Sequence, residues 1–207
     1  MSLTAVILAD GSFPTHEIPL GYLRKADHII CCDGSAENLV MAGLEPEAIV
    51  GDLDSLSPEI AEKFADRLYK YSEQDTNDLT KAVRWCIDKR YEEIVILGAT
   101  GKREDHTIAN ISLLGEYCRN IKVTMVTDTG TIIPLLKSCK VPSFPGQQVS
   151  IFSADPETEI TANGLEYKLK GLKLHNWWRA SLNEATGESF ELSFTGGPLI
   201  VYQKFRD

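Results

Sequence analysis

The sequence predicts an α/β protein in which a mostly parallel N-terminal α/β domain precedes a small C-terminal antiparallel β-sandwich domain. In the first two thirds of the chain, short β-branched runs alternate with segments of helical apolar spacing, which is typical of strand–helix repeats around a parallel sheet. After about residue 131 the chain changes to short strands separated by turns, which indicates antiparallel sheets. The 207 residues, 43% of them hydrophobic and 25% charged, suffice for one large or two small globular domains.

The first domain is expected to alternate buried strands with helices in a Rossmann-like arrangement. The strand segments are rich in Val, Ile and Cys and are residues 4–8, 28–32, 48–50, 94–97 and 123–126. The helical segments are residues 36–42, 58–65, 77–89 and 107–118. Helix-start signals precede three of them: Ser57 before Pro58, Thr76 or Asn77 before the second, and Asp105 before the third.

After about residue 131 the expected strands are 131–136, 148–153, 190–194 and 199–203. Residues 141–146 carry two prolines and a glycine, which favours a boundary near residue 140 and predicts the domains 1–139 and 140–207. A domain of about 70 residues is marginal by itself. We therefore expect it to pack on the first domain or on a second copy of itself.

Charge and cysteine usage exclude several classes of protein. The net charge of −9 argues against broad binding to nucleic acid. Five cysteines, an odd number without a C-x-x-C motif, argue against a disulfide framework and a structural zinc site. Because no apolar run approaches about 18 residues and no basic N-terminal region is visible, we expect a cytoplasmic protein without membrane or nucleic-acid partners.

Two aspartates directly follow the predicted strand 48–50. In extended chain, Asp52 and Asp54 would project to one face, about 6–7 Å apart. That spacing lets two carboxylates share a hard cation such as Mg²⁺. Ligands of open α/β sheets bind beyond the carboxyl ends of the strands, where this segment should lie. The alternative is a turn with two solvated aspartates.

A second acidic pair, Asp75 and Asp78, surrounds the predicted start of helix 77–89. Aspartates at such positions most often cap a helix and interact with its dipole. Four aspartates at two neighbouring edges are harder to explain as caps, because close carboxylates repel one another unless a cation neutralises them. The two pairs together favour a metal site.

Residues 98–107 run from a strand through Gly98 and Gly101 and the cations Lys102 and Arg103 into a helix. Backbone N–H groups at such a helix start, together with the cations, form an anion site suited to a polyphosphate. An arginine can also clamp two phosphate oxygens in bidentate fashion. His106 is expected in or near the helix cap.

Two further segments offer possible ligand contacts. Asp33 and Gly34 follow the strand 28–32, where Asp33 could touch a ribose or the metal; an ordinary strand-to-helix turn is the alternative. The segment 177–184 sets Trp177 and Trp178 beside short polar residues, which suits stacking on a flat heterocycle or core packing with a hairpin turn. Adjacent cysteines inside the apolar strand 28–32 are expected to be inert packing.

These segments together resemble the thiamine pyrophosphokinase family. The resemblance rests on residues 51–55 (GDLDS), 74–82 (QDTNDLTKA) and 98–107 (GATGKREDHT), with weaker matches at 164–169 and 181–184. It covers both predicted domains. It implies an enzyme that transfers the terminal pyrophosphoryl group of ATP to the hydroxyl of thiamine, giving thiamine diphosphate and AMP. It also implies a homodimer with sites at the subunit interface.

The resemblance implies roles by position. Asp52, Asp54 and Asp78 would hold Mg²⁺ with Asp75 beside them, and Arg103 and Asp105 would lie at the polyphosphate. The nucleotide-binding set it implies is Asp33, Gly34, Gly98, Gly101, Lys102, Arg103, His106 and Thr107. The thiamine-binding set it implies is Trp178, Ser181 and Asn183.

The sequence departs from the family pattern at four positions. Lys102 stands where a glycine is usual and Asn77 where a threonine is usual. Glu37 follows the Asp-Gly turn where an asparagine is frequent, and Leu182 separates Ser181 from Asn183.

Attack on the β-phosphorus needs charge neutralisation and in-line positioning more than covalent catalysis. Mg²⁺ and Arg103 can supply both, and Asp75 or Asp105 is expected to accept the hydroxyl proton.

Three alternative functions stay open. The first is a pyrophosphokinase for another flat alcohol such as a hydroxymethylpterin. The others are a D-x-D phosphohydrolase with Asp52 as nucleophile and Asp54 as acid, and a nucleotide-binding regulator without turnover.

Overall fold

The computed structural model describes residues 3–206 and divides into two compact units. The first comprises residues 1–113 and 120–128, and the second comprises residues 114–119 and 129–207. The division therefore lies between Asp128 and Thr129 and not near residue 140. The reason is that β7 (Gly130–Leu135), which precedes the proline-rich segment, pairs along its length with β14 (Leu199–Lys204) of the second unit.

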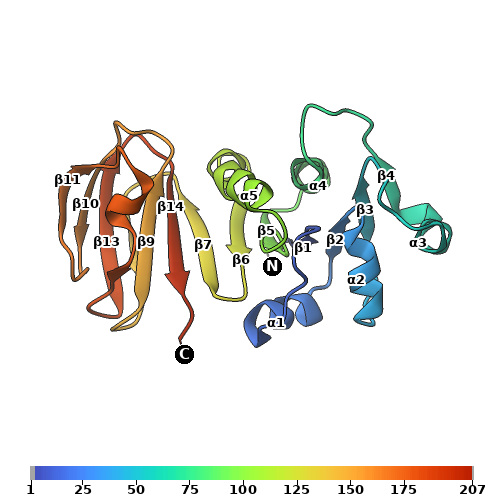
Figure 1. The fold of residues 1–207 in the computed structure, drawn as a ribbon, viewed down its shortest axis with the longest axis horizontal. Coiled ribbons are helices and arrows are strands. Elements are labelled where there is room, and N and C mark those ends of the chain that lie inside the picture. The colour runs from blue at the N-terminus through green and yellow to red at the C-terminus, as the bar shows by residue number, and fades with distance from the viewer. Residues whose placement is uncertain (1–2, 207) are drawn as a thin grey trace. The chain divides into compact units, whose positions relative to one another are not determined.

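The first unit is built on six parallel strands in the order β6-β5-β1-β2-β3-β4, and their labels follow that sequence in Figure 1. Their bounds are β1 Thr4–Leu8, β2 Ile29–Cys32, β3 Ala48–Gly51, β4 Leu68–Lys70, β5 Glu93–Leu97 and β6 Lys122–Val126. The chain passes outward from β1 to β4 and then returns to the other side of β1. The strand order thus reverses between β1 and β5, and ligands of such sheets bind in the crevice at this reversal. The predicted parallel α/β fold is confirmed.

Four of the helices overlap the four predicted helical segments, and a fifth helix, α1, was not predicted. Their bounds are α1 Glu17–Lys25, α2 Ser35–Met41, α3 Pro58–Lys63, α4 Asp78–Asp88 and α5 Glu104–Tyr117, with a 3₁₀ turn at Ala65–Arg67. Helix α1 was not predicted because it contains Pro19 and Gly21, which have low helix propensity, and because its N-cap is His16. None of the helices within residues 3–206 is long and apolar enough to cross a membrane.

Asp128, just after β6, fixes the entry into α1. Its carboxylate accepts hydrogen bonds from the N–H groups of Thr15 and His16 and from the Thr15 hydroxyl. Burial alone would raise the pKa of Asp128, but these hydrogen bonds hold it below its ordinary value. A depressed pKa means that the stabilisation is present above about pH 4 and is lost as the pH falls through the folded-state value.

We expect Asp128→Ala to lower the free energy of unfolding by about 2 kcal/mol at pH 7 and by much less near pH 2. Urea denaturation at both pH values measures the difference. An equal loss at the two values would contradict this explanation of the loop.

The second unit is a sandwich of two antiparallel sheets with the orders β12-β9-β14-β7 and β11-β10-β13-β8. The remaining bounds are β8 Cys139–Pro142, β9 Gln148–Ser153, β10 Glu159–Asn163, β11 Leu169–Lys173, β12 Asn183–Glu184 and β13 Ser189–Thr195, with a 3₁₀ turn at Trp177–Ala180. Both sheets contribute to one core, for example Ile151 and Val201 from one and Ile160 and Phe190 from the other. The predicted β-sandwich is confirmed.

Four of the eight strands in this unit were not predicted. Strand β8 ends in Pro142, β11 contains Gly171 with a φ of 57°, and β12 has only two residues. Strand β10 carries exposed Glu159 and Asn163 at its ends. Their sequences therefore lack the β-branched runs that identify a strand.

Candidate active site

A cleft of about 390 Å³ opens in the first unit at the carboxyl ends of β1, β2, β3 and β5. The loops that follow β1 and β5 form one side, and the starts of α4 and α5 complete the lining. The cleft therefore lies at the reversal of strand order, where the parallel sheet predicts a ligand.

Three carboxylates meet at this end of the sheet. Asp33, Asp52 and Asp54 each offer one oxygen, and these oxygens lie within 4.8 Å of one another. The prediction that Asp52 and Asp54 share one face of an extended chain is wrong. The strand ends at Gly51, Leu53 has a φ of 64°, and the Asp54 N–H donates to Asp52 Oδ1 at 3.3 Å. The two side chains are brought together by this turn.

Gly51 allows further acidic side chains to approach the cluster. A Cβ at Gly51 would lie 3.0 Å from the Asp33 Cβ and 3.3 Å from the Asp78 Cγ. Asp33 and Asp78 thus pack against the bare backbone of Gly51, and Asp78 lies beside the three grouped carboxylates.

Asp33 is the most unusual member of the cluster, because only 3% of its surface is exposed. Its Oδ2 accepts a hydrogen bond from the Ser55 N–H, whereas its buried Oδ1 has no partner among residues 3–206. Burial, reinforced by neighbouring carboxylates, raises the pKa of Asp33 to about 6. A buried carboxylate oxygen without a donor, next to two further carboxylates, fits a hard divalent cation such as Mg²⁺.

The raised pKa of Asp33 gives the metal-free protein a characteristic pH dependence. A pKa raised from 3.8 to about 6 means that the metal-free folded state loses stability as the pH rises from about 4 to above 6. Mg²⁺ binds the deprotonated carboxylate, so its stabilisation should be larger at pH 8 than at pH 5. Thermal unfolding with and without Mg²⁺ at both pH values tests this, and an unchanged profile in Asp33→Asn would contradict it.

The start of α4 supplies the floor of the cleft. Asn77 is its N-cap, with Oδ1 accepting from the Thr80 N–H at 2.9 Å, so neither Asp75 nor Asp78 is the capping residue. Asp78 Oδ1 instead accepts from the ammonium of Lys81 at 2.9 Å, and Lys81 is only 2% exposed. This buried lysine neutralises one charge beside the acidic cluster. Asp75 is exposed and does not line the cleft.

The predicted metal set and the observed grouping therefore differ in one member. Asp52 and Asp54 occur in both, whereas the grouped oxygens include Asp33 in place of Asp78. Sequence reasoning could not distinguish these two, because the ion pair between Asp78 and Lys81 depends on the buried position of the lysine.

The glycine-rich loop after β5 pairs with the loop after β1. The Gly11 N–H donates to the Gly98 carbonyl at 2.6 Å, and the Ser12 N–H donates to the Thr100 carbonyl at 2.8 Å. Gly98 and Gly101 have φ values of 64° and 94°, which favour glycine. Neither glycine lines the cleft, so they shape the loop that does.

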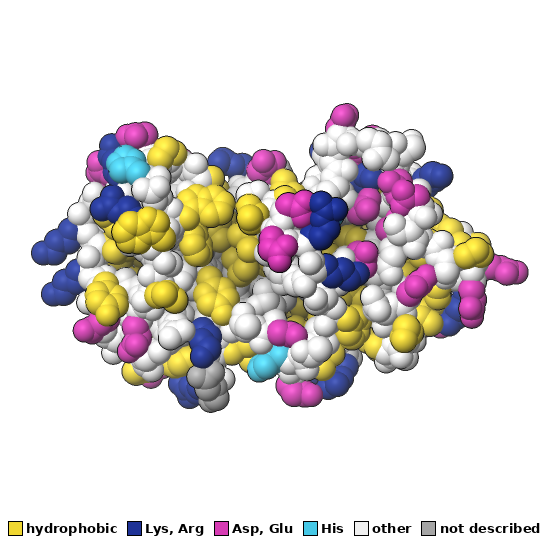
Figure 2. All heavy atoms as spheres, viewed as in Figure 1, with side chains coloured by type: hydrophobic (Ala, Val, Ile, Leu, Met, Phe, Trp, Pro, Cys, Tyr) yellow, Lys and Arg dark blue, Asp and Glu magenta, His cyan; other side chains and the backbone are white. Residues whose placement is uncertain are grey.

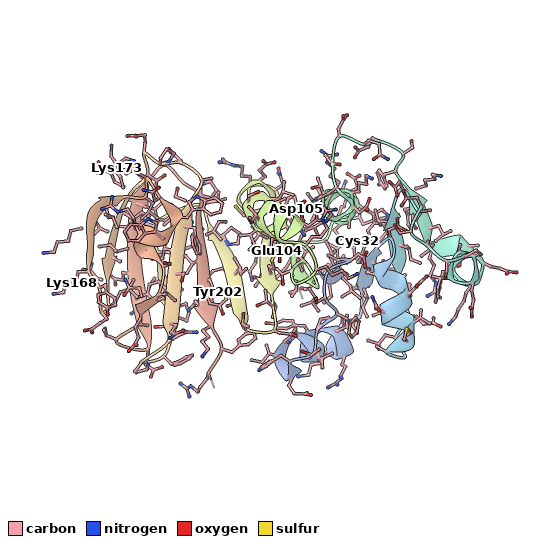
Figure 3. The ribbon with its side chains drawn as sticks, in the orientation of Figure 1. Cys32, Glu104, Asp105, Lys168, Lys173 and Tyr202 are labelled. Atoms are coloured by element: carbon pink, nitrogen blue, oxygen red, sulfur yellow. The ribbon has the colours of Figure 1, made fainter. Side chains whose placement is uncertain are left out.

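Each cation of this loop has a carboxylate partner in the described chain. Arg103 donates from Nε and Nη2 to the two oxygens of Asp105, and these hydrogen bonds lower the pKa of Asp105 to about 2. Lys102 donates to Asp10 Oδ1 at 2.8 Å. Figure 3 shows Glu104 and Asp105 at the first turn of α5, three residues earlier than the predicted helix.

The cleft is lined by four predicted nucleotide-binding residues of this segment: Lys102, Arg103, His106 and Thr107. Gly34 lies nearby, because a Cβ there would be 3.6 Å from Asp10 Oδ2 and from the Ser55 Cβ. Cys32, labelled in Figure 3, is buried at the end of β2, and burial raises the pKa of its thiol, in agreement with inert packing.

Two asparagines connect the acidic side of the cleft to the glycine-rich side. Asn77 Nδ2 donates to Asn110 Oδ1 at 3.0 Å, and Asn110 Nδ2 donates to the Ala99 carbonyl at 2.9 Å. The single side chain of Asn77 thus caps α4 and also hydrogen-bonds to Asn110 of α5.

The cleft residues that sequence reasoning did not single out include Asp10, Gly11, Lys81 and Asn110. Asp10-Gly11 follows β1 closely, as Asp33-Gly34 follows β2, and that repeated signal could have identified the first pair. Lys81 and Asn110 lie within helical segments and carry no such signal.

In the second unit, several large hydrophobic side chains of the predicted thiamine segment are exposed, and Figure 2 shows such side chains on the surface of this unit. Trp178 is 73% exposed and Leu182 is 75% exposed. Ser181 Oγ donates to the Trp178 carbonyl at 2.7 Å. Leu182, which interrupts the Ser-Asn pair, has a φ of 56° and lies in a turn.

Asn183 differs from its neighbours because it is only 2% exposed. Its Nδ2 donates to the Tyr167 carbonyl at 2.7 Å, and its Oδ1 accepts from the N–H groups of Tyr167 and Glu184. The amide is therefore occupied by backbone groups and supports the loop. A direct contact of Asn183 with thiamine stays a prediction.

We expect Asn183→Ala to lower the free energy of unfolding by about 2 kcal/mol, since it leaves backbone groups of Tyr167 unpaired. Trp178→Ala should change it by less than about 0.5 kcal/mol because the indole is exposed. Urea denaturation of the two variants gives the comparison, and equal stabilities would contradict the supporting role of Asn183.

Comparison with known families gives two matches that together cover both units. Residues 20–126 match the model described as thiamin pyrophosphokinase, catalytic domain. Residues 130–202 match the model described as thiamin pyrophosphokinase, substrate-binding domain. The boundary between the two matches agrees with the division of the structure after Asp128.

Curated relatives carry the same name. The chain is 26% identical over 166 residues to thiamin pyrophosphokinase 1 of Caenorhabditis elegans, which covers 73% of this chain and 68% of the relative. It is 35% identical to thiamine pyrophosphokinase of Bacillus subtilis over 130 residues, and this aligned region covers 59% of this chain and 60% of the relative.

Solved structures of similar fold cover nearly the whole chain. The crystal structure of thiamine pyrophosphokinase from Bacillus subtilis superposes with a TM-score of 0.81 at 25% identity, covering 99% of this chain and 100% of that one. Thiamin pyrophosphokinase from Candida albicans superposes with a TM-score of 0.82 at 17% identity, covering 98% and 90%, and this second likeness concerns the fold alone.

Proposed function

Because this chain belongs to the thiamin pyrophosphokinase family, we propose that its first unit binds ATP with Mg²⁺ and transfers the pyrophosphoryl group to thiamine. The chain is thus an enzyme of the thiamine diphosphokinase class, and the products are thiamine diphosphate and AMP. One observation carries the assignment to this cleft: the buried Oδ1 of Asp33, without a hydrogen-bond partner among residues 3–206, lies with the carboxylates of Asp52 and Asp54, and Asp52 lines the same cleft as Lys102 and Arg103.

Mg²⁺ would be held by Asp33, Asp52 and Asp54, with Asp78 beside them. When bound, the ion neutralises charge on the phosphate oxygens during transfer. Asp78 is kept in place by Lys81, whose buried ammonium also lowers the repulsion among the carboxylates before the ion arrives.

The polyphosphate would lie against the loop after β5. Lys102, Arg103, His106 and Thr107 line this side, and the first N–H groups of α5 are suited to an anion. Gly98 and Gly101 would act through the shape of the loop. Gly34 and the neighbouring turn lie near the acidic side, where a ribose could be accommodated.

Transfer forms a bond from the thiamine hydroxyl oxygen to the β-phosphorus and breaks the bond from that phosphorus to the oxygen shared with the α-phosphate. The hydroxyl proton must pass to a base. Asp105, with a pKa of about 2 and an ion pair to Arg103, is a weak acceptor at neutral pH, and Asp75 lies outside the cleft lining. Both stay predictions, and an alanine variant with unchanged kcat would exclude the residue concerned.

Thiamine would be bound by the second unit, where the exposed indole of Trp178 suits stacking on a flat heterocycle and Ser181 offers a hydroxyl nearby. We propose a homodimer with the sites at the subunit interface, since Trp177, Trp178 and Leu182 expose apolar side chains within one short segment and such patches mark interaction surfaces. We also propose that the enzyme is cytoplasmic, in keeping with its free cysteines and net charge of −9.

The decisive experiment measures AMP release from ATP and Mg²⁺ with thiamine, with a hydroxymethylpterin, and without an acceptor. Thiamine-dependent AMP release is the expected result. AMP release that requires the pterin would identify the other pyrophosphokinase. Release of ADP and phosphate, with a phospho-aspartate at Asp52, would identify a phosphohydrolase. ATP binding without AMP under any acceptor would identify a regulator.

A further inference from the structure

Asp10 lies in the loop after β1 and is held on both sides by backbone hydrogen bonds. The Ala9 N–H donates to the Leu97 carbonyl at 2.9 Å, and the Gly11 N–H donates to the Gly98 carbonyl at 2.6 Å. The backbone of Asp10 is therefore joined to the loop after β5, and Asp10 itself lines the cleft.

The Asp10 carboxylate lies between the two sides of the cleft. Its Oδ1 accepts from the Lys102 ammonium at 2.8 Å, and its Oδ2 lies 3.6 Å from the position of a Cβ on Gly34. Gly34 immediately follows the metal-cluster residue Asp33. Asp10 thus links the cation of the glycine-rich loop to the turn that carries the acidic cluster.

This ion pair has little value for stability. Lys102 and Asp10 have side chains that are 52% and 46% exposed, and exposed pairs contribute between zero and about 1 kcal/mol. A function in binding explains its position better. An ammonium group has three N–H donors, of which the bond to Asp10 uses one, so the others remain able to donate to phosphate oxygens.

We propose that Asp10 is a positioning residue that holds the Lys102 ammonium at the cleft before ATP arrives. A free lysine loses most of its side-chain conformational freedom when it binds a phosphate. A lysine already held by Asp10 loses less on binding, so Asp10 strengthens polyphosphate binding although it carries a negative charge itself. The proposal rests on the proposed binding of ATP in this cleft.

The test compares wild type with Asp10→Ala, Lys102→Met and the double variant. Calorimetry measures the dissociation constants of Mg²⁺-α,β-methylene-ATP, which cannot be cleaved at the transferred bond, and of AMP. We expect each single variant to bind the triphosphate about tenfold more weakly and AMP with unchanged affinity. The double variant should bind the triphosphate no more weakly than Lys102→Met alone, because Asp10 acts only through Lys102.

The matched control is Lys122→Met. Lys122 has an exposed side chain and pairs with Glu93 at 3.0 Å. The pair lies at the starts of β5 and β6 and therefore at the opposite end of the parallel strands. The Lys122→Met variant should leave the dissociation constants of the triphosphate analogue and of AMP unchanged. Melting temperatures of all variants should stay close to that of wild type.

Unchanged or tighter triphosphate binding in Asp10→Ala would overturn the proposal, as would multiplicative losses in the double variant or an equal loss of AMP affinity. In those cases wild type still binds the triphosphate and the proposed function stands. Wild type that binds no triphosphate would overturn both.

Discussion

Asp54→Asn is expected to lower the Mg²⁺-dependent kcat for AMP release at least about a thousandfold while the protein stays folded. Asparagine keeps the shape of aspartate and its ability to accept the hydrogen bond from Ser55 Oγ at 3.0 Å. It removes one of three carboxylates whose oxygens lie within 4.8 Å. The loss should therefore come from metal binding, and steady-state kinetics over a range of Mg²⁺ concentrations measures it.

The melting temperature separates this explanation from unfolding. Without Mg²⁺, Asp54→Asn should melt at or above the wild-type temperature because it relieves repulsion within the cluster. Addition of Mg²⁺ should raise the melting temperature of wild type and have little effect on the variant. Asp66→Asn, which changes an exposed carboxylate of the 3₁₀ turn, is the control. Wild-type Mg²⁺ dependence in Asp54→Asn would contradict the metal site.

Gly11→Ala is expected to lower the free energy of unfolding by about 3 kcal/mol and to raise the KM for ATP at least tenfold. A Cβ at Gly11 would lie 2.3 Å from the Gly98 carbonyl oxygen and 2.5 Å from that of Thr100. Both are backbone atoms that cannot rotate away. The two loops would have to separate, which breaks their hydrogen bonds and displaces the phosphate side of the cleft.

Gly21→Ala is the matched control for this change. Gly21 lies in α1, and a Cβ there would meet no atom within 4 Å. This substitution should stabilise the protein by about 0.5–1 kcal/mol, because alanine favours the helix, and leave the KM unchanged. Urea denaturation of the two variants measures the change in stability, and steady-state kinetics over a range of ATP concentrations measures the change in KM. Similar behaviour of both glycine variants would show that the loops are not closely paired.

The sequence predicted the elements whose burial imposes a simple pattern. The strands 4–8 and 148–153 agree with the structure at both ends, and α4 agrees with the predicted helix 77–89 to within one residue at each end. Elements that are exposed, short or interrupted by proline and glycine were missed, because local composition does not reveal pairing with distant strands.

The candidate site was predicted where chemistry follows a strand directly. Asp52, Asp54, Lys102 and Arg103 follow β3 and β5 and line or adjoin the cleft. The partners of these residues could not be predicted. Asp10 with Lys102 and Asp33 with Asp54 are joined only after parallel strands place their ends side by side.

The amide chain from Asn77 through Asn110 to Ala99 has a consequence for solution conditions. Amides neither titrate nor attract counterions, so the spacing that this chain maintains between α4 and the loop after β5 is insensitive to pH and ionic strength. The ion pairs of Lys102 and Arg103, by contrast, are exposed and screened by salt. Activity lost at high salt would then reflect weaker capture of the nucleotide by an undistorted cleft, and it should return in full on dilution.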